Sequence, residues 1–130
     1  MEYDPLHQVL YFYGGNYDPN TSLWRFDIGK RSWKKLAPGG EGPGTGTTSG
    51  PGLAYDTVND VLAVYFGGTI WIYDPAGNRW EKERPELHPS DADYVFGRFR
   101  YDPVNNGFWL HVPEGGEHAT WFYRYRNRRE

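Results

Sequence analysis

The sequence predicts an all-β fold assembled from one unit that is repeated three times along the chain. Tyr-Asp dipeptides begin at residues 3, 55 and 101, at intervals of 52 and 46 residues. Each is followed by a glycine pair and then an aromatic segment, the pairs being Gly14-Gly15, Gly67-Gly68 and Gly115-Gly116. Strand-type sequence that repeats with a period of about 40 to 50 residues is typical of β-propellers, in which each repeat is a four-stranded blade.

The composition agrees with this prediction. The length of 130 residues is that of one domain, and 17 Gly and 10 Pro separate short runs of aromatic and β-branched residues. There is no cysteine, which excludes a disulfide scaffold, a thiolate metal site and a cysteine nucleophile. The formal net charge of −3 gives no indication of nucleic-acid binding.

Nothing in the sequence indicates a membrane protein. No apolar run approaches the ~18 residues that a spanning helix needs, so we expect a soluble chain without a membrane partner. The repeat begins at the first residues, so we expect either no signal peptide or one that has been removed upstream. The cellular compartment is not indicated.

The second unit displays the predicted order of strands most clearly. Four strands are expected over residues 52–55, 61–66, 69–73 and 79–84, joined by polar turns and by Gly67-Gly68. Such strands pair as an antiparallel meander, which is one blade. The continuously apolar second strand indicates burial on both faces. The charged fourth strand, which contains Glu81, Lys82, Glu83 and Arg84, indicates a solvated outer edge.

The first and third units follow the same order. Strands are expected over residues 9–13, 23–26 and 33–36 in the first and over 94–101, 108–112 and 120–126 in the third. The third unit lacks a fourth strand, and only residues 1–4 of the first unit's inner strand are present. We therefore predict blade 1 over about 1–38, a mobile glycine-rich loop over 38–52, blade 2 over 52–85, a stiffer connector over 86–93 and blade 3 over 94–127.

Two recurring residue types have predicted structural roles. Trp33 and Trp80 open the fourth strands of the first two units, and we expect both to pack inward between blades. The glycine pairs are expected at bulges or positive-φ turns where side chains do not fit.

With these features the chain resembles the kelch repeat. The kelch pattern has a double glycine closing the second strand, an aromatic residue in the third, a Tyr-Asp-Pro-type turn, and a tryptophan opening the fourth. The resemblance covers nearly the whole chain and is most specific in the first two units. It implies a closed propeller of more than three blades that acts as a binding scaffold, although a few members, such as galactose oxidase, are enzymes. The matching residues are Gly14, Gly15, Trp24, Phe26, Asp27 and Trp33; Gly67, Gly68, Trp71, Tyr73, Asp74, Pro75 and Trp80; and, less completely, Gly115, Gly116 and Trp121.

Three blades do not close a propeller, and this shortage predicts a partner. An arc of three blades leaves an apolar face at each end, which exceeds the few hundred Å² that monomers usually expose. We expect a two-fold homodimer whose 3 + 3 blades form a six-bladed ring with apolar blade-to-blade interfaces. The alternatives are a fragment of a longer propeller and a designed half-propeller that has no evolved ligand.

The expected function is non-catalytic binding or assembly, with loops presented to a protein or peptide ligand. Arg98 and Arg100 alternate with Phe99 on the predicted inner strand of blade 3 and are weak candidates for holding an anion or acidic peptide in the channel. Pairing with neighbouring carboxylates is the alternative interpretation. A carbohydrate-binding propeller is the second functional hypothesis, because Trp and Tyr offer flat faces to sugar rings. An enzyme would need a channel site built from two subunits.

Other chemistry is not predicted. The glycine-rich loop lacks the lysine and the following helix of a P-loop, which argues against a nucleotide site. His111, Glu114, Glu117 and His118 are the densest set of potential metal ligands, but they flank a Gly-Gly turn and do not form H-E-x-x-H on a helix, so no metal or other cofactor is expected.

The remaining polar residues have simpler interpretations. The acid pairs Asp91/Asp93 and Glu81/Glu83 do not by themselves indicate a hydrolase, and the second pair is expected to be solvated. His7 and His88 are expected to be solvated turn residues. Serines 22, 32, 49 and 90 lie in turns without a nucleophile-elbow context. The terminal arginines 124, 126, 128 and 129 are interpreted as frayed or paired with an adjacent subunit, and not as a nucleic-acid site.

Overall fold

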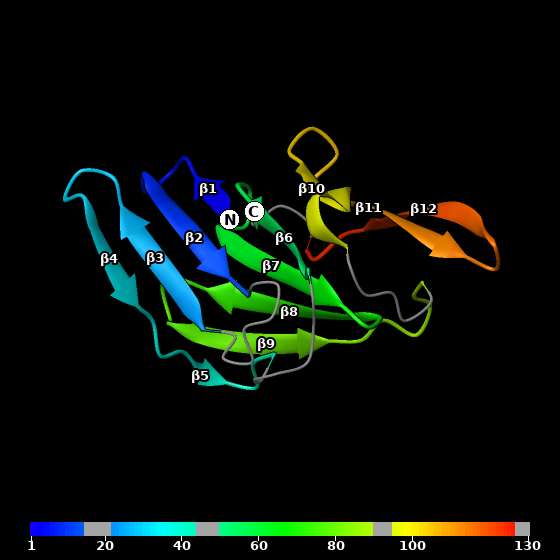
Figure 1. Ribbon diagram of the computed structural model, residues 1–130, viewed down its shortest axis with the longest axis horizontal. Coiled ribbons are helices and arrows are strands. Elements are labelled where there is room, and N and C mark those ends of the chain that lie inside the picture. Colours follow the sequence, from blue (N-terminus) through cyan, green and yellow to red (C-terminus); the bar gives the residue numbers. More distant parts are fainter. Residues whose placement is uncertain (15–21, 44–49, 90–94, 127–130) are drawn as a thin grey trace.

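The fold is all-β, as the sequence predicts, and consists of three separate antiparallel meanders with one short parallel strand added (Figure 1). The computed structural model describes residues 1–14, 22–43, 50–89 and 95–126. None of the helical residues described there belongs to a segment long and apolar enough to cross a membrane. We call the meanders sheet 1, sheet 2 and sheet 3 in chain order.

Each sheet pairs its strands in the order in which they occur along the chain. Sheet 1 contains β1 (Glu2–Asp4), β2 (Val9–Tyr13), β3 (Leu23–Asp27) and β4 (Ser32–Lys35). Sheet 2 contains β6 (Gly52–Asp56), β7 (Val61–Phe66), β8 (Thr69–Asp74) and β9 (Arg79–Glu83). Sheet 3 contains β10 (Phe99–Asp102), β11 (Gly107–Glu114) and β12 (Glu117–Tyr123).

The first strands of the three sheets lie next to one another. In Figure 1, β1, β6 and β10 lie near the middle of the upper part, while β4, β9 and β12 lie farther out at the left, the bottom and the right. Contacts join β6 both to β1 and to β10, so β6 is the middle one of the three. We call β1, β6 and β10 the inner strands.

The strand register gives each sheet two faces of different residues. We call the side that contains Tyr3, Tyr55 or Tyr101 the front face and the other side the back face. The back face of sheet 1 packs on the front face of sheet 2 in one core cluster, and the back face of sheet 2 packs on the front face of sheet 3 in a second. Sheet 2 is therefore buried on both sides, which explains why all of β7 is apolar.

Two faces are left uncovered among the described residues. The front face of sheet 1 exposes Tyr3, Phe12, Trp24 and Trp33. The back face of sheet 3 exposes Trp109 and Phe122. Within one chain Trp33 is exposed, because no described segment covers the front face of sheet 1, so its packing between blades stays a prediction. Trp80, at the equivalent register position of sheet 2, is buried as expected.

Two of the three glycine pairs form two-residue hairpin turns. Gly67 and Gly68 connect β7 to β8, and Gly115 and Gly116 connect β11 to β12, all four with positive φ. Positive φ at both central positions is what a type I′ hairpin requires. At three of the four (Gly67, Gly115 and Gly116) an added Cβ would meet no atom within 4 Å, so backbone conformation, not lack of space, demands glycine there. Gly14 also has positive φ, and Gly15 lies outside the described residues.

Three other features differ from the sequence prediction. Gly39–Gly40 forms β5, which pairs with β9 in parallel and makes sheet 2 five-stranded, so part of the predicted mobile loop is ordered in a sheet. The inner strand of sheet 3 begins at Phe99, because Phe96–Arg98 forms a short 3₁₀ helix, η1. The third strand of sheet 3 ends at Tyr123 and not at Arg126.

Candidate functional site

The turn after each inner strand is built in the same way around an aspartate. Asp56 Oδ1 accepts hydrogen bonds from the backbone N–H groups of Val58 (2.9 Å) and Asn59 (2.8 Å), and its Oδ2 accepts one from Asn59 Nδ2 (2.7 Å). Asp102 binds the backbone of Val104 and Asn105 and the side chain of Asn105 in the same pattern. A short side-chain oxygen that accepts from its own turn is the reason that aspartate is favoured here.

His7 occupies the asparagine position of the first such turn. Asp4 Oδ1 accepts from the backbone N–H groups of Leu6 (2.8 Å) and His7 (3.1 Å), and Asp4 Oδ2 lies 2.7 Å from His7 Nδ1. The three turns read YDPLHQ, YDTVND and YDPVNN, so His7 aligns with Asn59 and Asn105. His7 is exposed, as expected, but the expectation that it has no partner is wrong, and the alignment of the turns is the signal that identifies its role.

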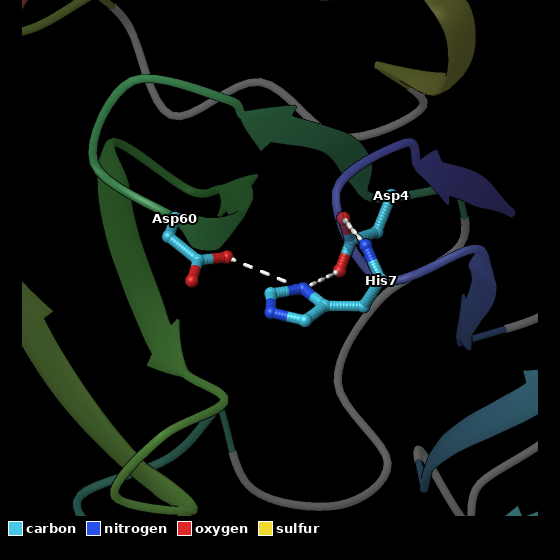
Figure 2. Close-up of side chains that lie close together, drawn as sticks. All are labelled: Asp4, His7 and Asp60. Carbon is cyan, nitrogen blue, oxygen red and sulfur yellow. Dashed lines mark hydrogen bonds and ion pairs between the residues drawn. The ribbon is translucent and has the colours of Figure 1, made fainter.

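These turns also contact one another across the sheet junctions. His7 Nδ1 lies 3.5 Å from Asp60 Oδ1 of the next turn (Figure 2). At the following junction, Asn59 Nδ2 donates to Asn106 Oδ1 at 3.3 Å. Asp60 and Asn106 are equivalent, since each is the fourth residue after its aspartate and each has positive φ.

The tyrosine of each following turn completes the contact. The Tyr55 hydroxyl donates to Asp60, and the Tyr101 hydroxyl donates to Asn106 Oδ1 at 3.1 Å. We call each four-residue arrangement a turn network. The first joins sheets 1 and 2 through Asp4, His7, Asp60 and Tyr55, and the second joins sheets 2 and 3 through Asp56, Asn59, Asn106 and Tyr101.

Electrostatics distinguish the first turn network from the second. The hydrogen bond to Asp4 raises the pKa of His7, and the charge of Asp60 acts in the same direction. Burial, followed by the hydrogen bond to Asp60, raises the pKa of the Tyr55 hydroxyl, which therefore stays protonated and donates. In the second network asparagines stand at both junction positions, so that junction contains one carboxylate instead of two.

Among the described residues, Asp4, His7 and Asp60 also place three potential metal-ligand atoms within 4.8 Å of one another. Two observations favour a structural role over a metal site. Both oxygens of Asp4 already accept hydrogen bonds within the turn. The second turn network has the same arrangement with asparagine in place of the histidine, and an amide nitrogen does not bind metals.

A pocket of about 300 Å³ lies at the ends of the inner strands and is lined by all three sheets. Arg100 of β10 and Glu2 of β1 face each other there, with 3.8 Å between Arg100 Nη1 and Glu2 Oε2. Burial raises the pKa of Glu2, while the charge of Arg100 lowers it. Aromatic and apolar side chains complete the wall. We call this the inner-strand pocket; its lining includes Glu2, Phe12, Tyr13, Leu53, Phe96 and Arg100.

The two arginines predicted as weak binding candidates are placed differently. Arg100 lines the inner-strand pocket with an exposed guanidinium, and its Nε donates to Gly97 O. Arg98 lies in η1, donates through Nε to Val95 O, and does not line this pocket.

The other predicted clusters take part in ordinary side-chain contacts. His111 and His118 stack across the β11–β12 hairpin with ring centroids 5.2 Å apart, and His111 Nδ1 bonds Thr120 Oγ1. Glu114 accepts from Trp121 Nε1 at 3.3 Å. These residues and Glu117 do not form a described group of three potential metal ligands.

The acid pair Glu81/Glu83 is not simply solvated, because both carboxylates bind tyrosines of the third repeat. Glu81 accepts from the Tyr125 hydroxyl at 2.7 Å, and Glu83 accepts from Tyr123. Burial, followed by these carboxylates, raises the pKa of both hydroxyls. Arg126 pairs with Glu81 at 3.3 Å within the same chain. Asp91 and Asp93, Ser49 and Ser90, and Arg128 and Arg129 lie outside the described residues.

Comparison with known proteins adds no family to these observations. No model of a known family matches the chain, and no curated protein has a sequence similar to it.

Proposed function

We propose that the chain is a non-catalytic, kelch-type binding or assembly module that forms half of a six-bladed β-propeller and completes the ring with a second copy. The observation that carries the proposal is the unequal exposure of equivalent aromatic residues. Trp71 and Trp80 on the front face of sheet 2 are 8% and 6% exposed. Trp24 and Trp33, at the same register positions of sheet 1, are 36% and 53% exposed.

The repeat itself indicates what covers the front face of sheet 1. The back face of a preceding sheet buries this face in sheets 2 and 3. The uncovered back face of sheet 3 is the one described surface of that kind that remains free, and it presents Trp109 and Phe122. Contact between sheet 3 of one copy and sheet 1 of the other, made twice, buries both faces in a closed assembly.

The ligand we assign to this module is a protein segment or peptide that enters the inner-strand pocket. The volume of about 300 Å³ is at the lower end of the range for small-molecule sites. Its wall combines the Arg100 guanidinium and Glu2 carboxylate with the exposed ring of Phe96. Such a wall can form charge-assisted hydrogen bonds and an apolar contact with one side chain, or with one chain end, of the bound peptide.

The exposed tryptophans do not favour the carbohydrate hypothesis under this proposal. The equivalent tryptophans of sheet 2, Trp71 and Trp80, are buried and pack against other side chains. The ring centroids of Trp71 and Phe66, for example, lie 4.4 Å apart. Trp24 and Trp33 are then subunit-interface residues and are not available to a sugar.

Sedimentation velocity of two variants tests the assembly. Trp24→Glu and Trp33→Glu change exposed side chains, so the isolated chain should still fold, but each places a charge in the proposed interface. We expect either one to weaken the two-copy assembly by about 100-fold or more, as for tryptophan hot spots. Leu87→Glu is the matched control, because Leu87 is 79% exposed and lies on neither uncovered face. Equal masses for all three variants and the natural chain would contradict the proposal and return the tryptophans to the carbohydrate hypothesis.

A further inference from the structure

The residues through which two copies recognise each other can be assigned from the turn networks, and this assignment rests on the proposed ring. We infer that Asp102 and Asn105 of one copy form a third turn network with Gln8 and Tyr3 of the second copy. Each existing network takes its aspartate and the following His or Asn from one sheet. It takes its positive-φ residue and its tyrosine from the next sheet.

The first half of a third network is already formed on sheet 3. Asn105 Nδ2 donates to Asp102 Oδ2 at 2.7 Å, the same distance as between Asn59 Nδ2 and Asp56 Oδ2. The two asparagines differ in burial. Sheet 3 covers Asn59, which is 2% exposed, whereas no described sheet covers Asn105, which is exposed. Asn105 thus presents an amide with the orientation of Asn59 but without a following sheet.

The second half is present on sheet 1. Gln8 has φ of 55°, close to the 58° of Asp60 and the 52° of Asn106, so its backbone adopts the same left-handed turn position. Tyr3 occupies the position of Tyr55 and Tyr101, yet its ring is 45% exposed while that of Tyr55 is 3% exposed. Among the described residues, neither the Tyr3 hydroxyl nor the side-chain carboxamide of Gln8 has a hydrogen-bond partner.

The chemistry of the two halves is complementary. A carboxamide oxygen on Gln8 can accept from Asn105 Nδ2, as Asn106 Oδ1 accepts from Asn59 Nδ2. The Tyr3 hydroxyl can donate to Gln8 as Tyr101 donates to Asn106. The pair is uncharged, so burying it in an interface carries no cost of desolvating a charge at the junction positions.

Aromatic packing beside the network supports the same pairing. Tyr11 on the back face of sheet 1 stacks on Tyr55 with centroids 6.1 Å apart and planes at 10°. Trp109 is the residue of sheet 3 at the register position of Tyr11, and its Nε1 donates to Asp102 Oδ2 at 3.0 Å. The assignment therefore places Trp109 of one copy against Tyr3 of the other.

Cross-linking tests this assignment directly, because the natural chain has no cysteine. The double variant Gln8→Cys/Asn105→Cys is treated with a short bis-maleimide and separated under denaturing conditions. We expect covalent dimers from the double variant and none from either single variant. The double variant His7→Cys/Asp60→Cys is the internal control, since it should link within one chain at the junction where the two side chains already meet.

The outcomes separate this assignment from the proposed ring. If light scattering finds two copies, but only the internal control reacts, the assignment is wrong while the ring stands. Covalent dimers from Gln8→Cys alone would overturn the assignment in favour of contact between two copies of sheet 1. A single-copy mass at all concentrations would overturn the ring itself.

A second measurement does not depend on cross-linking. Asn105→Lys is expected to weaken the two-copy assembly by about 10- to 100-fold, because it replaces the carboxamide that faces Gln8 with a longer, charged side chain. Combining it with Gln8→Glu should restore part of that loss, because the two charges then meet across the junction. An unchanged or further weakened assembly in the combined variant would contradict the assignment.

Discussion

At the scale of single residues, the aspartates that follow the inner strands do most to define the structure. Asp4 and Asp56 are 0% and 1% exposed, and each is buried by the sheet that follows it. Their carboxylates are held by backbone and side-chain donors of their own turn, which replaces the water that burial removes. The same carboxylates lie at the junction of two sheets, so they link local turn structure to packing.

Replacing a buried turn aspartate should therefore cost far more than replacing a half-buried one that makes fewer hydrogen bonds. Asp56→Ala removes the acceptor of three hydrogen bonds, and it leaves Asn59 Nδ2 buried with a single partner. We expect a loss of about 3 kcal/mol in the free energy of unfolding. Asp74→Ala is the matched change in the β8–β9 turn, where the one described hydrogen bond is from Ala76 N, and should cost about 1 kcal/mol. Urea unfolding of both variants checks this, and equal losses would contradict it.

We expect His7 to make the first junction sensitive to pH. Its pKa is raised by the hydrogen bond to Asp4, and the carboxylate of Asp60 favours the charged form while Arg25 opposes it. Because the folded-state pKa is raised, the added stability is fully present below the unfolded value of about 6.5 and is lost as pH rises through the folded-state pKa.

His7→Asn isolates this effect, since asparagine makes the equivalent bond at Asn59 and Asn105. Urea midpoints of the natural chain and the variant are compared between about pH 5.5 and pH 8.5. The natural chain should lose stability relative to the variant as pH rises above about 6.5. Parallel pH curves would mean that the imidazole charge does not contribute to the junction.

At the scale of elements, the hairpin turns reveal how the sequence specifies the sheets. Gly67 and Gly68 have φ of 57° and 73°, and Gly115 and Gly116 have 57° and 83°. The paired glycines thus fix two-residue turns and, through them, the register of β7 with β8 and of β11 with β12.

Substitutions at Gly67 should follow backbone preference and not side-chain size. An added Cβ at Gly67 meets nothing within 4 Å. Gly67→Ala should cost about 1 kcal/mol of unfolding free energy because alanine resists positive φ, whereas Gly67→Asn should cost less, since asparagine tolerates it. Thermal or urea unfolding ranks the variants, and an asparagine variant less stable than the alanine variant would contradict this explanation.

The strands of sheets 1 and 2 could be predicted closely from sequence, because alternation, glycine pairs and Tyr-Asp turns are local signals. The strand β5 could not, since Gly39 and Gly40 have no side chains to form a pattern and pair with β9 only through the backbone. The helix η1 could not be predicted either, because the sequence around Arg98 predicts one continuous strand. The exposure of Trp33 depends on which segment lies above sheet 1, which no local pattern records.

The candidate site was predictable only in part for the same reason. The sequence predicts Arg100 as a candidate from its place next to Phe99 on an inner strand, and Arg100 does line the inner-strand pocket. Its partner Glu2 is distant in sequence and meets it only because β1 and β10 lie on either side of β6. The turn networks required the three Tyr-Asp turns to be compared with one another, which places His7 on the asparagine positions.

At the scale of the whole molecule, the row of three sheets ends in two unlike uncovered faces. At one end, the front face of sheet 1 exposes aromatic residues at positions that are buried in sheet 2. At the other end, the back face of sheet 3 is uncovered and contains Asp102 and Asn105, which form the first half of a turn network. These two faces resemble the faces that pack on each other at the junctions within the chain. We therefore propose a second copy of the chain as the partner.

The most direct test of this account is the absolute mass of the natural chain in solution, measured by light scattering after size exclusion over a dilution series. The account predicts a mass twice that of the 15.1 kDa chain that persists on dilution, because two aromatic interfaces must separate together. A folded chain with a mass of 15.1 kDa at every concentration would contradict it, since Trp24, Trp33 and Trp109 would then remain uncovered.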